Sequence, residues 1–234
     1  MEVKSMTESV TEYLRKGIIT GRFAPGERLN ETELALRLNI SRPPIRESFR
    51  ILEKERLIVT IPRKGTHVTE LSVKDLEEVY AAREMLECYA IDLLGAKNAR
   101  TLPAVEEVLS LASKLAPPSV ENADEMVDYN LKCFGGYHLE LIRCTGNPWL
   151  IEFYNSIAFH LARYQCIYLY MPGGVEYSLE AHGSILRLIK NGFFARAKEE
   201  MRIHIRTTFE WLRDKISKAG DDATDSRPQR KPAP

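Results

Sequence analysis

The sequence of 234 residues has few cysteines, four in all, and no two of them form a CxxC pair. A chain of this length needs no disulfide framework, so the cysteines are expected to be reduced, and those at 133, 144 and 166 to be buried as small hydrophobic residues. No apolar run reaches the ~18 residues that a membrane-spanning helix requires. The first residues, MEVKSMTESVTEYL, lack the apolar region of a secretion signal. These absences argue against a membrane or secreted protein and favour a reducing cytoplasm.

The chain also lacks a net charge, because 33 lysines and arginines balance 33 acidic residues. The charge is nevertheless unevenly spread. Residues 42–64 contain seven basic and three acidic residues, which gives a local charge of +4. Phosphate contact depends on a local basic face rather than on the charge of the whole chain, so this segment is a candidate nucleic-acid surface.

The first 70 residues change from helical to strand periodicity. Apolar residues recur at helical spacing in three segments, and two short β-branched runs, LIVT and THVT, follow them. The sequence IPRKG between these runs predicts a turn with Arg63, Lys64 and Gly65 at its tip. The expected elements are helices over about 7–20, 31–38 and 43–55, and strands at 57–60 and 66–69. Three helices followed by a two-stranded hairpin form a winged helix-turn-helix.

From Ser72 onward the pattern is that of helices only. Ser72 with Asp75 predicts one helix start, and Asn147 with Pro148 predicts another, because proline is well tolerated at the first helical position. The expected helices cover about 72–95, 102–115, 122–144, 148–171, 176–190 and 194–217. Residues 219–234 are polar and proline-rich and are expected to be a disordered tail.

These patterns predict a mainly α protein. Its expected parts are an N-terminal winged helix-turn-helix domain (1–70), a C-terminal all-α bundle of six or seven helices (71–218) and the tail (219–234).

Residues 39–52, NISRPPIRESFRIL, predict the helix that would enter a DNA groove. Arg42 and Arg46 lie four residues apart and share one face, and the planar guanidinium group suits the O6 and N7 atoms of guanine. Arg50 continues this face toward phosphates. A basic helix face can also be merely solvated, but a basic hairpin tip directly after it favours DNA binding. The expected DNA contacts are Thr32, Ser41, Arg42, Pro43, Pro44, Arg46, Arg50, Arg63, Lys64 and Gly65.

The segment GRFAPGERLNETELALRLNISRPPIRESFRILEKERLIVTIPRKGTHV resembles the DNA-binding domain of the GntR superfamily of bacterial transcription regulators. The matching frame begins G.F.PG..L.E..LA..L..SR.P.RE and covers residues 17–68 with few gaps. The remaining helices resemble the FadR-like branch with an FCD effector domain, through R..LE at Arg83–Glu87, H........GN at His138–Asn147 and H..IL at His182–Leu186. The resemblance implies a homodimeric regulator, commonly a repressor, that binds a palindromic DNA operator and takes a small carboxylate or similar effector in its helical domain.

Pro43 departs from the family frame, in which this position is normally a small polar residue. A residue before proline is pushed away from the α conformation, so the helix is expected to begin one residue late, with Ser41 and Arg42 in an extended lead. Pro44 in the first turn costs little, because its missing N–H would have no partner within the helix. Pro43 is then expected to contact a thymine methyl group or nothing, which leaves base reading to Arg42 and Arg46.

The resemblance also implies a divalent metal, of zinc or nickel type, held by three histidines and one aspartate. The corresponding histidines are His138, His182 and His204. Two antiparallel helices that turn near residue 193 would place His182 and His204 level with each other, which supports two of the ligands independently. The aspartate is missing, because the position four residues before His138 is Phe134, followed by two glycines. Either the fourth ligand is lost, or the glycines distort the helix so that another group replaces it; three histidines without a metal are the alternative.

Two arginines are predicted in mid-helix beside apolar residues, where a charged group needs an anionic partner. Arg83 and Arg163, together with His160, are therefore expected to bind the effector. Their alternative role is an internal salt bridge to Glu84, Glu87 or Glu140. Two other functions stay open: a metal-free, acyl-CoA-responsive regulator of the same superfamily, and a metal-dependent hydrolase. The hydrolase would lack a general base beside the histidines and would leave the hairpin unexplained.

Overall fold

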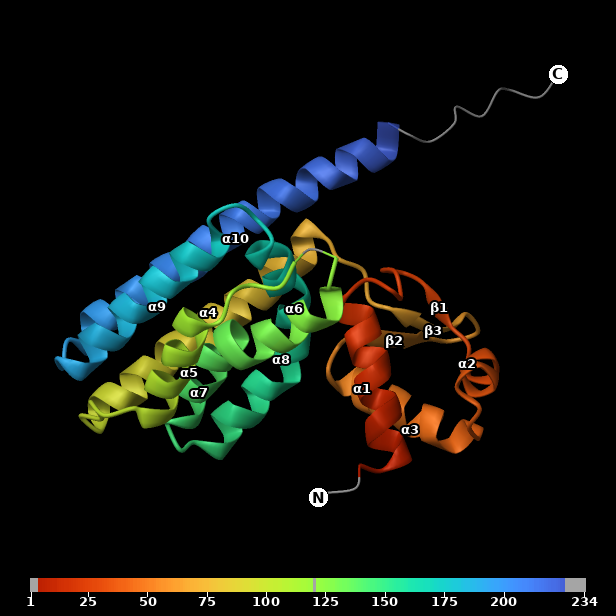
Figure 1. The fold of residues 1–234 in the computed structure, drawn as a ribbon, viewed down its shortest axis with the longest axis horizontal. Helices are drawn as coiled ribbons and strands as arrows, with labels where there is room; N and C mark the ends of the chain where they lie inside the picture. Colours follow the sequence, from red (N-terminus) through yellow and green to blue (C-terminus); the bar gives the residue numbers. More distant parts are fainter. Residues whose placement is uncertain (1–3, 120, 226–234) are drawn as a thin grey trace.

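The computed structural model describes residues 4–119 and 121–225 and contains helices with one small sheet (Figure 1). The N-terminal elements are α1 (Met6–Ile19), β1 (Arg28–Leu29), α2 (Glu31–Leu38), α3 (Arg42–Lys54), β2 (Ile58–Ile61) and β3 (Gly65–Val68). The strands are antiparallel in the order β1-β3-β2, with Ile58 opposite Val68. The predicted winged helix-turn-helix is confirmed. Its third strand, β1, escaped prediction because two residues are too short for a period-2 pattern.

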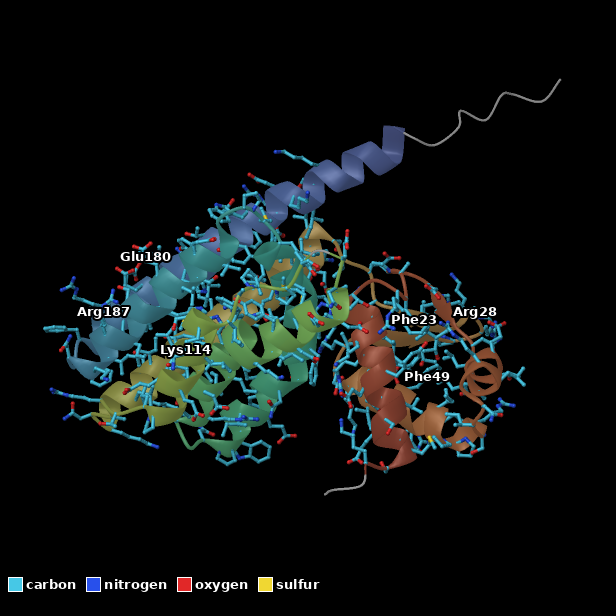
Figure 2. The ribbon with its side chains drawn as sticks, in the orientation of Figure 1. Phe23, Arg28, Phe49, Lys114, Glu180 and Arg187 are labelled. Atoms are coloured by element: carbon cyan, nitrogen blue, oxygen red, sulfur yellow. The ribbon has the colours of Figure 1, made fainter. Side chains whose placement is uncertain are left out.

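One hydrophobic core holds these N-terminal elements together. Helix α1 begins with a capping box, in which the Ser5 hydroxyl accepts from the Glu8 N–H and the Glu8 carboxylate accepts from the Ser5 N–H. Figure 2 shows Phe23 and Phe49 among the side chains inside this part of the molecule, whereas Arg28 lies on its outside. The core comprises Val10, Leu14, Ile18, Phe23, Leu29, Leu34, Ala35, Ile45, Phe49, Leu52, Leu57, Ile58 and Val68. Burial of Ile45, Phe49 and Leu52 fixes α3 by one face and leaves its arginine face free.

The second part of the chain is an all-helical bundle with its own core. Its elements are α4 (Val73–Ala96), α5 (Pro103–Lys114), α6 (Ala123–Tyr129), the π-helical segment η1 (Asn130–Phe134), α7 (Gly135–Arg143), α8 (Pro148–Leu169), α9 (Gly174–Lys190) and α10 (Phe194–Asp225). Helices α9 and α10 run side by side along one edge of the bundle, and α10 also packs along α4 (Figure 1). A mainly α fold with a helical second part is thus confirmed.

The segment expected as one helix over 122–144 is interrupted by the wide turn η1. A Cβ atom placed on Gly136 would lie 2.7 Å from the carbonyl oxygen of Leu131, so only glycine fits against this turn. The helix is therefore distorted at the two glycines, as one of the two alternatives for the missing aspartate proposed. Among the described residues, however, no carboxylate replaces the missing aspartate beside the histidines, and Phe134 itself is buried.

Two expectations about helix ends are wrong. Helix α3 begins at Arg42, not one residue later, and of the two residues expected in an extended lead only Ser41 is extended (φ −73°, ψ 161°). Pro43 and Pro44 occupy the second and third helical positions, where no intrahelical N–H bond is needed, so the chain accepts both. Helix α10 continues to Asp225, past the expected start of the tail at 219, and residues 226–234 lie outside the described range.

The two parts of the chain touch along α1 and α8 (Figure 1). Arg15 of α1 lies over the ring of Phe159, 4.1 Å from its centroid. Lys16 and Arg22 form ion pairs with Asp128 and Asp124, at 2.8 and 3.0 Å. Across the described residues, none of the helices combines the length and the apolar character needed to cross a membrane.

Candidate DNA-binding helix and buried histidine site

Helix α3 presents its arginines to solvent. The side chains of Arg42 and Arg46 are each 55% exposed, and that of Arg50 is 74% exposed. Arg42 and Arg46 both approach one carboxylate oxygen of Glu31, at 3.3 and 3.5 Å, which holds them side by side. Two parallel guanidinium groups at the start of an exposed helix can reach base edges in a major groove.

A buried side chain on the inner face of α3, rather than an N-cap side chain, fixes the start of this helix. Ser41 is the N-cap residue but makes no side-chain cap hydrogen bond. The buried hydroxyl of Ser48 donates to the carbonyl oxygens of Pro44 and Thr7, at 2.8 and 3.1 Å, and so ties the first turn of α3 to α1. Ser41 and Pro43 are exposed and free to meet a partner.

The other predicted DNA contacts lie at two exposed places. Thr32 is in the first turn of α2, where its N–H donates to the Asn30 side chain. Arg63 and Lys64 form the tip of the β2–β3 hairpin, with Arg63 at φ 65° and Gly65 at φ 95°. Glycine suits that turn, because a positive φ strains most other residues.

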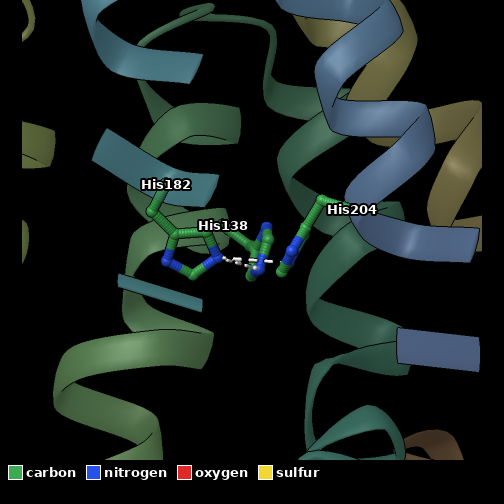
Figure 3. A group of neighbouring side chains, drawn as sticks. All are labelled: His138, His182 and His204. Atoms are coloured by element: carbon green, nitrogen blue, oxygen red, sulfur yellow. Dashed lines mark hydrogen bonds between the residues drawn. The ribbon is translucent and has the colours of Figure 1, made fainter. Parts of the chain in front are cut away.

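Three histidines from three helices meet inside the bundle (Figure 3). His138 comes from α7, His182 from α9 and His204 from α10, and each is about 2% exposed. The Nε2 atom of His182 lies 3.1 Å from that of His138 and 3.2 Å from that of His204. Facing lone pairs repel, so nitrogens this close need a proton or a cation between them. The predicted cluster of histidines therefore exists as a contiguous group.

Glu87 and Arg83 on α4 orient His138. Glu87 Oε2 accepts from His138 Nδ1 at 2.7 Å, which leaves the Nε2 lone pair of His138 facing the cluster. Arg83 Nε donates to Glu87 Oε1 at 2.8 Å, and its Nη2 donates to the His138 Nε2 lone pair at 2.6 Å, so a metal bound by this nitrogen has to displace Arg83 from it. Glu87 is the salt-bridge partner of Arg83 that the sequence left open, and Arg83 also lies at the cluster.

Burial sets the charge of this site. Burial lowers the pKa of His138, and the Arg83 charge lowers it further, while Glu87 opposes both. Burial also places the pKa values of His182 and His204 well below the ordinary value, with a further lowering from His138. Burial alone would raise the pKa of Glu87, but His138 and Arg83 outweigh it and hold the carboxyl ionised. The histidines are thus neutral, which is the form that binds metals.

The residues present fit a divalent cation. Nitrogen ligands about 2.0–2.1 Å from a tetrahedral zinc ion are roughly 3.3–3.4 Å apart, close to the separations above. The ligand atoms of all three histidines lie within 4.8 Å of one another, and among the described residues no Asp or Glu joins that group. The ring of Phe134 instead packs against His182, with centroids 6.0 Å apart. Three histidines would leave a coordination position open to an exogenous ligand beside Arg83.

The chamber around the histidines, lined also by Arg83, Phe134 and Gln165, is small, with a volume of about 20 Å³. The Nδ1 atom of His204 is buried there without a hydrogen-bond partner. An unpaired buried polar atom is costly, and a bound group or a water molecule would satisfy it.

The structure places His160 and Arg163 away from this chamber. His160 Nε2 lies 2.7 Å from Asp75 Oδ2, and the Tyr164 hydroxyl donates to the same oxygen at 2.5 Å. Arg163 donates to the hydroxyl and the carbonyl oxygen of Thr69, at 2.8 and 3.0 Å. These five residues, the linker cluster, join α8 to Thr69 in the segment between β3 and α4 and to Asp75 in the first turn of α4. No sequence pattern indicated these partners, because Asp75 is 85 residues from His160 and Thr69 is 94 residues from Arg163 along the chain.

Two family models together match most of the chain. The family model described as "Bacterial regulatory proteins, gntR family" matches residues 6–68, and the FCD domain model matches residues 78–207. The first range contains α3 and the hairpin, and the second contains Arg83, Glu87 and all three histidines.

Individual relatives match along most of the chain. The HTH-type transcriptional regulator YdhC of Bacillus subtilis is 32% identical over 206 residues, which cover 86% of this chain and 88% of that protein. The HTH-type transcriptional repressor GlaR of Escherichia coli is 26% identical over 201 residues, covering 83% and 90%. The solved structure of E. coli McbR/YncC aligns with a TM-score of 0.67 at 20% identity, over 91% of this chain and 99% of that one. This last likeness concerns the fold alone.

Proposed function

The chain belongs to the GntR family of bacterial regulatory proteins and has an FCD domain, and from this premise we propose that it is a ligand-responsive transcription repressor. Proteins of this family are transcription regulators rather than enzymes. In the proposal, residues 1–70 bind DNA, residues 71–218 bind the effector and dimerise, and the homodimer binds a palindromic operator in the cytoplasm. The name of GlaR as a repressor supports repression over activation.

The observation behind the effector part of the proposal is the meeting of three neutral imidazoles with a buried arginine. His138, His182 and His204 would hold a divalent metal of zinc or nickel type, which would supply a Lewis-acidic position for an oxygen ligand. Arg83 would leave His138 Nε2 when the metal binds, and its guanidinium would then pair with the negative charge of the metal-bound ligand. A small carboxylate satisfies both groups, and we propose it as the effector class.

The DNA part of the proposal is supported by the free arginine face of α3. Arg42 and Arg46 would read bases, and Arg50, Arg63 and Lys64 would contact phosphates. Thr32, Ser41, Pro43, Pro44 and Gly65 would line the same surface.

Metal binding is tested on purified protein that has first been treated with a chelator. Titration with Co²⁺ should give one site per chain and raise the temperature of unfolding, because a ligand that binds only the folded state stabilises it. His182→Ala should abolish the site, whereas His67→Ala in strand β3 should keep it, since His67 lies outside the cluster. Full wild-type affinity in His182→Ala would exclude the site.

The same preparation separates the two effector classes. Small carboxylates should raise the unfolding temperature of the Co²⁺-loaded protein more than that of the chelated protein. A rise caused by acyl-CoA alone, equal with and without Co²⁺, would favour the metal-free regulator to which the missing aspartate points.

A further inference from the structure

A second, larger cavity lies between the two parts of the molecule. It has a volume of about 530 Å³ and is lined by Ile51 and Lys54 of α3, Leu139 of α7, and Ala158 and Phe159 of α8. This cavity is called the interdomain cavity below. Its size falls in the range of small-molecule sites, and much of its lining is apolar.

The histidine chamber alone is too small for an organic effector. Its volume of about 20 Å³ is enough for a metal ion or one water molecule. A carboxylate bound to Arg83 and to the histidines must therefore have the rest of its structure elsewhere. Any such extension has to pass through a wall of the chamber.

One side chain, Gln165, lines both the histidine chamber and the interdomain cavity. Its Oε1 atom accepts from Asn130 Nδ2 at 3.1 Å, and the Oδ1 atom of Asn130 is buried without a partner. Asn130 begins the π-helical segment η1, where the regular helical hydrogen bonds are interrupted. A single neutral hydrogen bond at an irregular turn is a weak barrier compared with a packed helix.

Other residues also bring the interdomain cavity close to the histidine chamber. Gly135 also lines the interdomain cavity, and a Cβ atom on it would lie only 3.1 Å from Gln165 Oε1. Tyr154, another lining residue, donates through its hydroxyl to Glu87 Oε1 at 3.4 Å. Two lining residues of the interdomain cavity therefore adjoin the histidine site, because Gln165 lines the histidine chamber and Tyr154 is hydrogen-bonded to Glu87.

We propose that the effector is a carboxylate with an apolar body, whose carboxylate lies at Arg83 and the histidines and whose body lies in the interdomain cavity. Gln165 turns aside to let it pass. This inference rests on the proposed function, because it extends the effector site assigned there.

In this position the apolar body of the ligand would contact the DNA-binding helix α3 directly. Ile51 and Lys54 lie on α3, the helix whose N-terminal half bears Arg42 and Arg46. A ligand in the interdomain cavity contacts α3 on one side and α7 and α8 on the other. It therefore changes the position of α3 relative to α7 and α8 by direct contact.

The test uses straight-chain carboxylates, from acetate to octanoate, titrated into the Co²⁺-loaded full-length protein by calorimetry. Affinity should rise about four-fold for each added methylene until the cavity is full, because each methylene leaves water for an apolar site. Ala158→Trp fills the cavity and should remove this rise while leaving acetate affinity unchanged. Ala195→Trp, an exposed position on α10, should bind the whole series as the wild type does.

A second variant guards against misfolding of Ala158→Trp. Leu139→Ala enlarges the cavity, so the chain length of tightest binding should increase by one or two methylenes. If wild-type protein binds acetate and octanoate equally, or if Ala158→Trp keeps the rise, the inference is wrong and the proposed function stands. If wild-type protein binds no carboxylate, acetate included, the proposed effector class fails and the inference fails with it.

Discussion

Glu87 determines how His138 takes part in the histidine site. Its carboxylate is fully buried and bonded to both Arg83 and His138, which fixes the tautomer of the imidazole. The positive charge of Arg83 and the negative charge of Glu87 balance. A divalent cation that binds alone therefore leaves a net positive charge buried in the site, whereas an anionic ligand that binds with it reduces that charge. This balance favours joint binding of metal and carboxylate over binding of either alone.

The buried histidines make the stability of the metal-free protein depend on pH. Their pKa values are lowered in the folded state, so below the ordinary value of about 6.5 the unfolded chain binds protons that the folded chain does not. The free energy of unfolding should therefore be constant above pH 7 and fall between pH 6.5 and 5, by up to about 1.4 kcal/mol per pH unit for each histidine. Glu87 does not contribute in this window, because its stabilising effect is lost only below its unfolded pKa of about 4.3.

Urea unfolding with a chelator at pH 7.5, 6.5 and 5.5 measures this dependence. His182→Gln should show a shallower fall than the wild type. Equal stability of the wild type at pH 7.5 and 5.5 would contradict the assignment of buried neutral histidines.

Arg46 is expected to separate DNA specificity from DNA affinity. Its side chain is exposed, and its ion pair among the described residues is with Glu31, so Arg46→Ala should fold normally. Loss of a bidentate base contact should lower affinity for a selected operator about 10- to 100-fold, with a much smaller effect on random DNA. Fluorescence anisotropy at fixed salt compares the two DNAs.

Arg50→Ala is the matched control, since a phosphate contact should weaken both DNAs alike. An unchanged ratio of operator to random affinity in Arg46→Ala would show that another residue reads the bases.

At the residue scale, sequence reasoning found the members of the histidine site but not all of their partners. The family resemblance pointed to all three histidines, and helix pairing supported His182 and His204 independently, because a hairpin of helices fixes which positions are level. Arg163 and His160 were predicted at the effector, since a buried cation in a helix signals an anionic or polar partner. The signal does not say which partner; the linker provides Thr69 for Arg163, and the first turn of α4 provides Asp75 for His160.

At the scale of elements, the π-helical segment η1 shapes the wall of the histidine chamber. It places Asn130 against Gln165 and Phe134 against His182, both at walls of the histidine chamber. The wide turn brings the Leu131 carbonyl toward the next turn, where Gly136 makes room for it. The helix before His138 is thus shaped by backbone contact.

Two glycine substitutions separate this effect from ordinary helix propensity. Gly136→Ala puts a Cβ atom 2.7 Å from a backbone oxygen and should destabilise the protein by about 1 to 3 kcal/mol. Gly183→Ala in α9 meets only ordinary contacts, the nearest at 3.5 Å, and should be neutral or stabilising by up to about 1 kcal/mol. Urea unfolding of both variants measures the difference, and equal effects of the two would mean that η1 does not require glycine.

The order and type of the long elements were predictable because apolar periodicity specifies them. Helix boundaries were less so, as the start of α3 illustrates. A rule for the residue before proline favoured a late start, whereas the buried contacts of Ile45 and Ser48 hold the first turn helical from Arg42. The π-helical turn was foreshadowed only by Gly135 and Gly136, since an extra residue in one turn depends on the neighbouring helices.

At the scale of the whole molecule, α8 connects the histidine chamber to the N-terminal part of the chain. Gln165 on α8 lines the histidine chamber, and Arg163, two residues earlier, holds Thr69 of the linker. Thr69 in turn donates through its N–H to the Leu57 carbonyl oxygen at the base of the hairpin. Hydrogen bonds therefore link α8 to the base of the wing, and we expect a ligand that displaces α8 to act on the wing through them.

This connection predicts that Arg163→Met uncouples the two parts without disabling either. The substitution keeps an apolar chain of similar length but removes both hydrogen bonds to Thr69. Wild-type protein should unfold in one calorimetric transition that moves to higher temperature with Co²⁺, because the bound metal stabilises everything that unfolds with its site. In Arg163→Met the N-terminal part should unfold separately, at a temperature that Co²⁺ no longer changes, while the upper transition keeps the full shift. Arg143→Met, which loses an exposed ion pair with Glu140, should behave as the wild type.

A single transition in Arg163→Met that shifts as a whole with Co²⁺ would show that the contacts of α1 with α8, and not the linker cluster, couple the two parts.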